Sequence, residues 1–157
     1  LVHGFLQLLP DIAPAAREEA AQRFLARPGL GLDEKMRASI ARETLALLVE
    51  PGFASLFGPG SLAEVPITGI IDGDVVSGQI DRLVVSADKV LVVDYKTARP
   101  VPEDTSRVPN AYLRQMALYR AVLKGVFPDH AITCALLYTA APKLITLPDG
   151  QLDGVLA

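Results

Sequence analysis

The chain has 157 residues, of which 50% are hydrophobic and 21% charged, and its formal net charge is -3. This composition excludes a disordered tail, because it allows one domain to bury about two-thirds of its unfolded surface. It also excludes a protein whose whole surface is basic, and no apolar run reaches the ~18 residues that span a bilayer. No secretory leader opens the chain. We therefore expect a soluble, cytoplasmic protein with no membrane partner.

The first third of the chain predicts three helices. Apolar residues recur at helical spacing over residues 2–9, and a second helix is expected over 14–27. Asp33 is a suitable N-cap for a third helix that continues to residue 49. Because helical spacing is already present at Leu1, which is not a methionine, we expect the sequence to be a segment of a longer protein.

Strands follow from about residue 64. Asp72-Gly73 is a hairpin turn signal, and runs rich in valine and isoleucine lie on both sides of it. Further elements are expected in this order: strands over 78–85 and 89–95, a helix over 110–126, and strands over 132–139 and 144–147. The order predicts one domain over 1–157, with a helical part over 1–60 and an α/β core over 61–157, in which helices flank a mixed central sheet.

The only cysteine, Cys134, lies in an apolar run. One cysteine excludes an internal disulfide and any four-cysteine zinc or iron–sulfur site. We expect this thiol to be buried and unreactive.

Two of the predicted strands each carry a carboxylate. If Ala87-Asp88 is the centre of the turn between them, Asp81 lies opposite Asp94 on one face, with Cβ atoms about 4.5–5.5 Å apart. A one-residue change in the turn would separate them. Two such carboxylates repel each other unless a positive charge lies between them, and a divalent cation such as Mg²⁺ prefers carboxylate oxygens.

Lys96 lies two residues after Asp94, so both side chains leave the same face of the strand. A lysine can orient an attacking water or stabilise negative charge on a phosphate oxygen. Two acids and a lysine at one place would suit metal-assisted hydrolysis of a phosphodiester. The alternative is a surface Asp–Lys pair worth less than about 1 kcal/mol, because Asp-x-Lys is a common sequence.

Four motifs, in chain order, resemble those of the RecB-like branch of the PD-(D/E)XK nucleases. They are Glu64, Gly78-Gln79-Ile80-Asp81-Arg82-Leu83, Asp94-Tyr95-Lys96-Thr97 and Gln115-Met116-Ala117-Leu118-Tyr119. Val2-His3-Gly4-Phe5-Leu6 is similar to the opening helix of the AddA-type nuclease domains within this branch. The resemblance runs from His3 to about Tyr138 and implies a restriction-endonuclease-like fold.

The resemblance implies a role for each residue of the metal site. Asp81, Asp94, a ring nitrogen of His3 and the backbone carbonyl of Tyr95 would bind the metal. Lys96 would assist the attacking water. Without the family, His3 would be an ordinary histidine on a helix surface.

Four further residues carry weaker implications. Gln115 and Tyr119, one helical turn apart, would support the site or the DNA strand, although core packing also explains the ring of Tyr119. Glu64 would lie at the edge of the active site, or would be a solvated strand charge. We expect Arg82 to be a structural ion-pair partner and not a catalytic group.

Basic residues outnumber acidic residues by eight to four over residues 82–124. They could contact phosphates, although each could also be a solvated surface charge. The candidates are Arg99, Arg107, Arg114, Arg120 and Lys124.

The activity that the resemblance implies is that of a Mg²⁺-dependent exonuclease, with Mn²⁺ as a substitute. Its substrate would be unwound single-stranded DNA, in bacterial double-strand break repair by homologous recombination. A fused helicase domain and an AddB-type partner subunit would complete the enzyme. There is no Gly-x-x-x-x-Gly-Lys-Ser/Thr phosphate loop, so an ATP site would lie outside this sequence. The single cysteine also argues against the iron–sulfur cluster of AddB-type relatives.

Two other functions remain open at this point. A nuclease fold could serve as a non-catalytic docking module for DNA or a subunit. The chain could also be a stand-alone RecB-like exonuclease.

Overall fold

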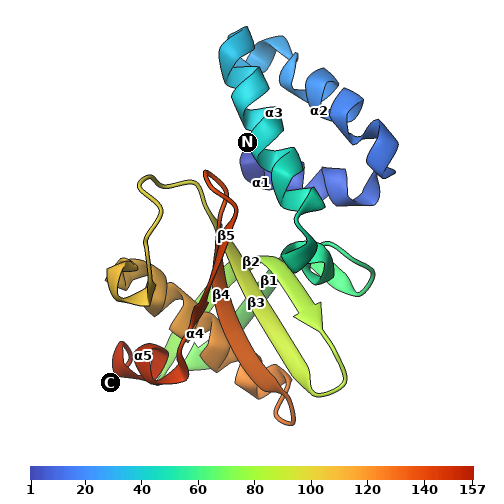
Figure 1. The fold of residues 1–157 in the computed structure, drawn as a ribbon. Helices are drawn as coiled ribbons and strands as arrows, with labels where there is room; N and C mark the ends of the chain where they lie inside the picture. The colour runs from blue at the N-terminus through green and yellow to red at the C-terminus, as the bar shows by residue number, and fades with distance from the viewer.

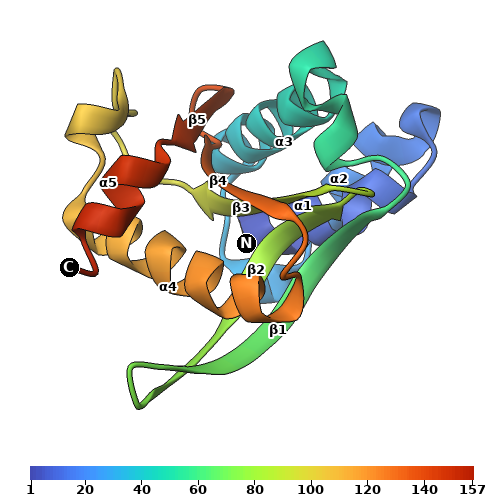
Figure 2. The ribbon, with the colours of Figure 1, turned by 90° about the horizontal axis from the view of Figure 1, so that it is seen from below.

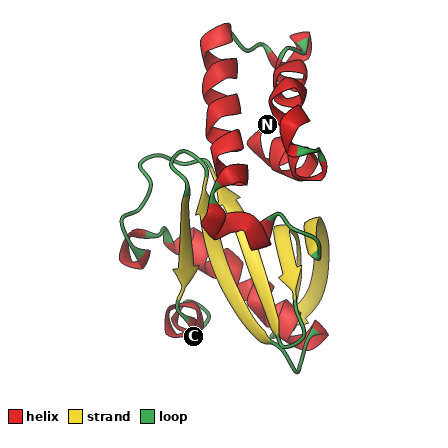
Figure 3. Cartoon of the chain, turned by 45° about the vertical axis from the view of Figure 1, so that its right-hand side comes forward, coloured by secondary structure: helices red, strands yellow, loops and turns green.

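The computed structural model describes residues 1–157, in which a helical N-terminal part stands at one end of a five-stranded sheet (Figures 1 and 3). The helices of this part are α1 (Val2–Leu8), α2 (Arg17–Leu25) and α3 (Glu34–Val49), joined by short 3-10 turns. The side chain of Asp33 accepts a hydrogen bond from the backbone N–H of Met36 at 2.8 Å, which confirms the predicted N-cap. A small core holds the three helices together; it contains Phe5, Leu9, Ala21 and Leu25.

The sheet has the strand order β1-β2-β3-β4-β5, in which only β3 and β4 run parallel. The strands are β1 (Ser61–Ile71), β2 (Asp74–Val85), β3 (Lys89–Lys96), β4 (Ala131–Tyr138) and β5 (Lys143–Leu147). Helix α4 (Asn110–Val126) makes the crossover that a parallel pair requires. The mixed α/β fold predicted from the sequence is confirmed.

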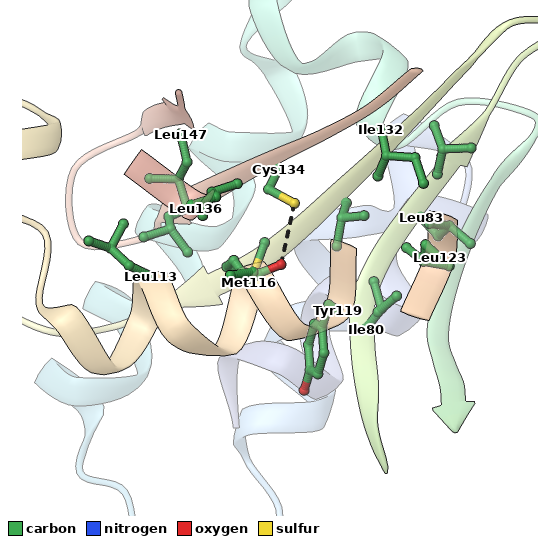
Figure 4. Packing of buried hydrophobic residues seen from close by; sticks show 14 of the residues in the cluster. Ile80, Leu83, Leu113, Met116, Tyr119, Leu123, Ile132, Cys134, Leu136 and Leu147 are labelled. Carbon is green, nitrogen blue, oxygen red and sulfur yellow. Dashed lines mark hydrogen bonds between the residues drawn. The ribbon is translucent and has the colours of Figure 1, made fainter. Parts of the chain in front are cut away.

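Each face of the sheet is buried against helices. Helix α4 and the short α5 (Asp149–Gly154) cover one face, and the helical part covers an end of the other (Figure 2). Neighbouring side chains of β3 point to opposite faces of the sheet. Val92 packs in one core with Met116 of α4, whereas Val93 packs in another with Leu6 and Leu47. Figure 4 shows the α4 side of this core.

Two glycines in the β1–β2 hairpin allow α4 to lie close to it. A Cβ atom at Gly78 would come within 2.6 Å of the Tyr119 hydroxyl oxygen, and one at Gly69 within 3.0 Å of Val122. A Cβ at Gly78 would require the Tyr119 side chain to move, and one at Gly69 would require the Val122 side chain to shift slightly. The position of Tyr119 over the sheet therefore depends on Gly78.

Several short elements were not expected from the sequence, and two of them bury apolar side chains. A 3-10 helix over Pro51–Leu56 buries Phe53 and Leu56, and α5 buries only Leu152. Helix α5 is short and contains two glycines, so its local sequence carries little helical signal. None of the helices combines the length and the apolar character that crossing a membrane requires.

Candidate active site

The site lies where strands β2 and β3 separate. Their ladder has the predicted register and ends at Arg82 opposite Val93, so Asp81 and Asp94 would form the next pair. They do not pair through the backbone. Instead, Oδ2 of Asp81 accepts a hydrogen bond of 2.7 Å from the backbone N–H of Tyr95. The carboxylate thus takes the place of a neighbouring strand and satisfies a buried donor.

Helix α1 brings His3 to the same point. Its Nε2 lies 3.2 Å from Oδ2 of Asp81, and its ring meets the ring of Tyr95 edge-on, with centroids 5.5 Å apart. The hydrogen bond to Asp81 is the main cause that raises the pKa of His3, and partial burial opposes it. An imidazole and a carboxylate 78 positions apart in sequence are therefore neighbours in the fold.

Asp94 and Lys96 form a buried ion pair on the α4 side of β3. Nζ of Lys96 lies 2.7 Å from Oδ2 of Asp94, and their side chains are only 13% and 8% exposed. Burial raises the pKa of Asp94, as does the charge of Asp81, while the hydrogen bond to Lys96 opposes the rise. The exposures exclude the alternative of a solvated surface pair.

A chain of hydrogen bonds continues from Lys96 onto α4. Nζ of Lys96 donates to Oε1 of Gln115 at 3.2 Å, and Nε2 of Gln115 donates to the Tyr119 hydroxyl at 3.2 Å. That hydroxyl in turn donates to the backbone carbonyl of Gln79 at 3.5 Å. The ring of Tyr119 packs in the core, as its apolar position predicted. The structure thus brings Gln115 and Tyr119 together with Lys96.

Glu64 lies at the edge of the cluster. It faces the position of Asp81 across the β1–β2 ladder, where the pairing is interrupted, and its φ is +52°. This is a conformation that few residues other than glycine adopt. The charge of Glu64 helps to raise the pKa values of His3 and Tyr95, so it is close enough to act on both.

Arg82 has a structural role, but not as an ion-pair partner. It is 4% exposed, and no carboxylate lies within ion-pair distance of it. Its guanidinium donates to the hydroxyls of Tyr95 and Ser61, at 3.1 and 3.2 Å, and to the backbone carbonyl of Leu6. The expected ion pair is therefore wrong, because neutral acceptors and a carbonyl of α1 satisfy the cation instead.

Arg120 is not free to contact a phosphate. It is 4% exposed and forms ion pairs with Asp149, at 2.6 Å, and with Asp153. Both partners belong to α5, which the sequence analysis did not predict. The prediction that Arg120 contacts a phosphate, which rested on its charge alone, is therefore wrong. Its side chain links α4 to α5 instead.

The other four phosphate candidates differ in their partners. Arg99 pairs with Glu43 of α3 at 2.8 Å, and Arg107 lies 3.9 Å from Glu103. Exposed candidates without an ion pair are Arg114 and Lys124. Their roles toward DNA stay predictions.

The donor atoms at the site suit a hard divalent cation such as Mg²⁺. Two buried carboxylates act on each other through their charges, and an imidazole lies beside one of them. In this structure, no three side chains of His, Cys, Asp or Glu are arranged so that they could hold a metal ion together. The hydrogen bonds of Asp81 with His3 and of Asp94 with Lys96 use oxygens that an ion would share. The chemistry of the donors therefore fits, with Asp81, Asp94 and His3 as side-chain ligands and the Tyr95 carbonyl as the predicted fourth.

Two hollows of the surface lie away from the site. A groove of about 820 Å³ lies between α2 and α3, and a smaller cleft of about 360 Å³ lies between β1 and α4. Neither is lined by His3, Asp81, Asp94 or Lys96. The candidate active site therefore lies outside these two hollows, where β2 and β3 separate.

Sequence reasoning missed the contact of Tyr112 with the site. Tyr112 lies in the predicted helix over 110–126, and Nζ of Lys96 lies 3.8 Å from the centre of its ring. The spacing of Tyr112, Gln115 and Tyr119, at i, i+3 and i+7, places all three on one side of a helix and could have indicated this.

The chain was compared with known proteins in three ways. No curated protein matches the sequence. A solved structure titled "Crystal structure of SSO0001" is 17% identical, covers 99% of this chain and 71% of its own, and has a TM-score of 0.38. The family model described as the PD-(D/E)XK nuclease superfamily matches residues 1–149, and the chain therefore belongs to that superfamily.

Proposed function

We propose that the chain is a metal-dependent DNA nuclease domain of the AddA/RecB type, which hydrolyses phosphodiester bonds of single-stranded DNA. One observation carries the proposal: the separation of β2 and β3 brings Asp81 beside His3, with Asp94 and Lys96 on the adjoining strand. Membership of a nuclease superfamily supports the same chemistry. The order of the four motifs along the chain supports the finer assignment.

The residues have separate tasks in this proposal. Asp81, Asp94 and His3 bind the cation, and PD-(D/E)XK nucleases generally use Mg²⁺ or Mn²⁺. Lys96 orients the attacking water and offsets charge that develops on the phosphate. A bound Mg²⁺ would supply Lewis acidity toward the phosphate and the water. Gln115 holds the lysine amine and is itself held by Tyr119.

The biological setting is part of the same proposal. A helicase domain on the same chain would supply unwound DNA, and an AddB-type subunit would be the partner in double-strand break repair. A domain that receives its substrate from a motor needs little affinity of its own, which agrees with a net charge of -3. The sequence encoded on either side of the chain would separate this setting from a stand-alone exonuclease.

A nuclease assay on end-labelled single-stranded DNA tests the proposal. We expect cleavage with Mg²⁺ or Mn²⁺ and none with EDTA. Asp94→Asn and Lys96→Met should each lower the rate by about 100-fold or more, because each removes a charge from the reacting centre. Asp88→Asn and Lys89→Met are matched controls, since both residues are exposed in or beside the β2–β3 turn.

The controls should cleave like the unaltered chain. Equal cleavage by all variants would contradict the proposal. Binding of DNA without cleavage, unchanged in Asp94→Asn, would support the non-catalytic docking module instead.

A further inference from the structure

We infer that Tyr112 is a positioning residue whose ring holds the Lys96 amine in place for its work at the phosphate, an inference that rests on the proposed function. Nζ of Lys96 lies 3.8 Å from the centre of the Tyr112 ring. This is within the distance at which an ammonium group is attracted to an aromatic face. No role for Tyr112 follows from the family motifs, because it lies outside all of them, three residues before the motif that begins at Gln115.

The amine has three neighbours that together leave it little freedom. Oδ2 of Asp94 and Oε1 of Gln115 accept its hydrogen bonds, at 2.7 and 3.2 Å. The ring of Tyr112 is the third neighbour. A lysine side chain has a flexible four-carbon stem and a strongly hydrated head, so two acceptors alone do not fix its position. With these neighbours around it, the Lys96 side chain is only 13% exposed.

The contact is made by the ring and not by the hydroxyl group. The Tyr112 hydroxyl makes no hydrogen bond within the protein, whereas the hydroxyl of Tyr119 makes two. Tyr112 is also half-buried, beside the fully buried Leu113 and Met116. Its ring also packs against the main core. Because the hydroxyl group has no partner, phenylalanine should replace tyrosine without loss.

The sharpest test observes the amine directly. In the NMR spectrum of the full chain, the Lys96 Cε protons should be shifted upfield by the ring current of Tyr112. Tyr112→Phe should keep this shift. Tyr112→Leu should abolish it, because leucine fills space but has no ring. A shift that persists in Tyr112→Leu would overturn the inference, and Tyr112→Met replaces that variant if it does not fold.

Kinetics of DNA cleavage give the second readout. Tyr112→Leu should lower kcat by about 10-fold with KM unchanged, because the ring acts on the amine and not on DNA binding. Tyr112→Phe should restore the unaltered rate. Equal losses in both variants would overturn the inference, since they would assign the effect to the hydroxyl group.

The two readouts also separate this inference from the proposed function. If the ring-current shift behaves as expected but no variant cleaves DNA, the ring holds the amine and the proposed nuclease activity fails. If DNA is cleaved but Tyr112→Leu loses neither the shift nor the rate, only the role of Tyr112 fails. Thermal unfolding of each variant serves as the control for folding.

Discussion

The carboxylate of Asp81 accepts a hydrogen bond from the backbone N–H of Tyr95, at 2.7 Å, one residue beyond the last backbone pair of β2 and β3. A side-chain oxygen thus takes the place of a backbone acceptor at the point where β2 and β3 separate. The same oxygen atom lies 3.2 Å from Nε2 of His3. Asp81 is therefore both a structural acceptor and a member of the candidate active site.

These two roles of Asp81 can be separated by substitution. Asp81→Asn keeps an oxygen for the Tyr95 N–H and should change stability little, while it abolishes cleavage through the loss of charge. Asp81→Ala leaves that buried donor unpaired and should lower the free energy of unfolding by about 1–3 kcal/mol. Urea denaturation measures the difference. Equal stabilities for the two variants would show that the hydrogen bond contributes nothing.

Gly78→Ala should destabilise the chain by about 1–3 kcal/mol, because the new methyl group would lie 2.6 Å from the Tyr119 hydroxyl oxygen. It should also weaken cleavage, since Tyr119 would be moved away from Gln115. Gly125→Ala in α4 is the matched control, as a Cβ there meets nothing within 4 Å and alanine favours a helix. In thermal unfolding, the melting temperature of Gly78→Ala should lie below that of the unaltered chain, and that of Gly125→Ala above it.

Arg82→Met should loosen α1 from the sheet. It leaves the Leu6 carbonyl and the Tyr95 hydroxyl without their donor and should cost about 2–3 kcal/mol. Hydrogen exchange should become faster over residues 2–8. Arg114→Met removes an exposed cation that has no ion pair and should change stability by less than about 0.5 kcal/mol. Protection of α1 that survives Arg82→Met would contradict this account.

The basic residues of α4 should separate into two classes. Arg120→Gln should lower stability through the loss of its contacts with Asp149 and Asp153, and should leave the salt dependence of DNA binding unchanged. If Arg114 and Lys124 contact phosphates, their substitution by glutamine should weaken binding to all sequences and reduce the salt slope by about 1 each. Affinity measured over a range of salt concentrations checks both expectations.

The thiol of Cys134 should be unreactive in the folded chain. Burial raises its pKa to about 12, from an ordinary value of 9.0, so the native state favours the protonated thiol. This contribution to stability is complete below pH 9 and is lost as the pH rises toward 12. A thiol reagent at pH 8 should therefore label the chain only after denaturation. Rapid labelling of the native protein would contradict the burial.

Much of the fold could be predicted from the sequence. The helix over 110–126 and the register of the β2–β3 hairpin are confirmed, because helical spacing, a turn of fixed length and β-branched runs are local signals. The same register predicted that Asp81 lies opposite Asp94, but the ladder ends one pair before them. These features depend on neighbours within a few residues, which is why one sequence was enough.

Tertiary structure alone decided what Arg82 and Arg120 do. Arg82 and Arg120 are equally basic in the sequence, yet one holds α1 and the other holds α5. The placement of Tyr112 against Lys96 likewise depends on the crossover that lays α4 over β3. The physical reason is that the function of a charge or a ring depends on burial and on partners far away in the chain, whereas sequence patterns report only local geometry.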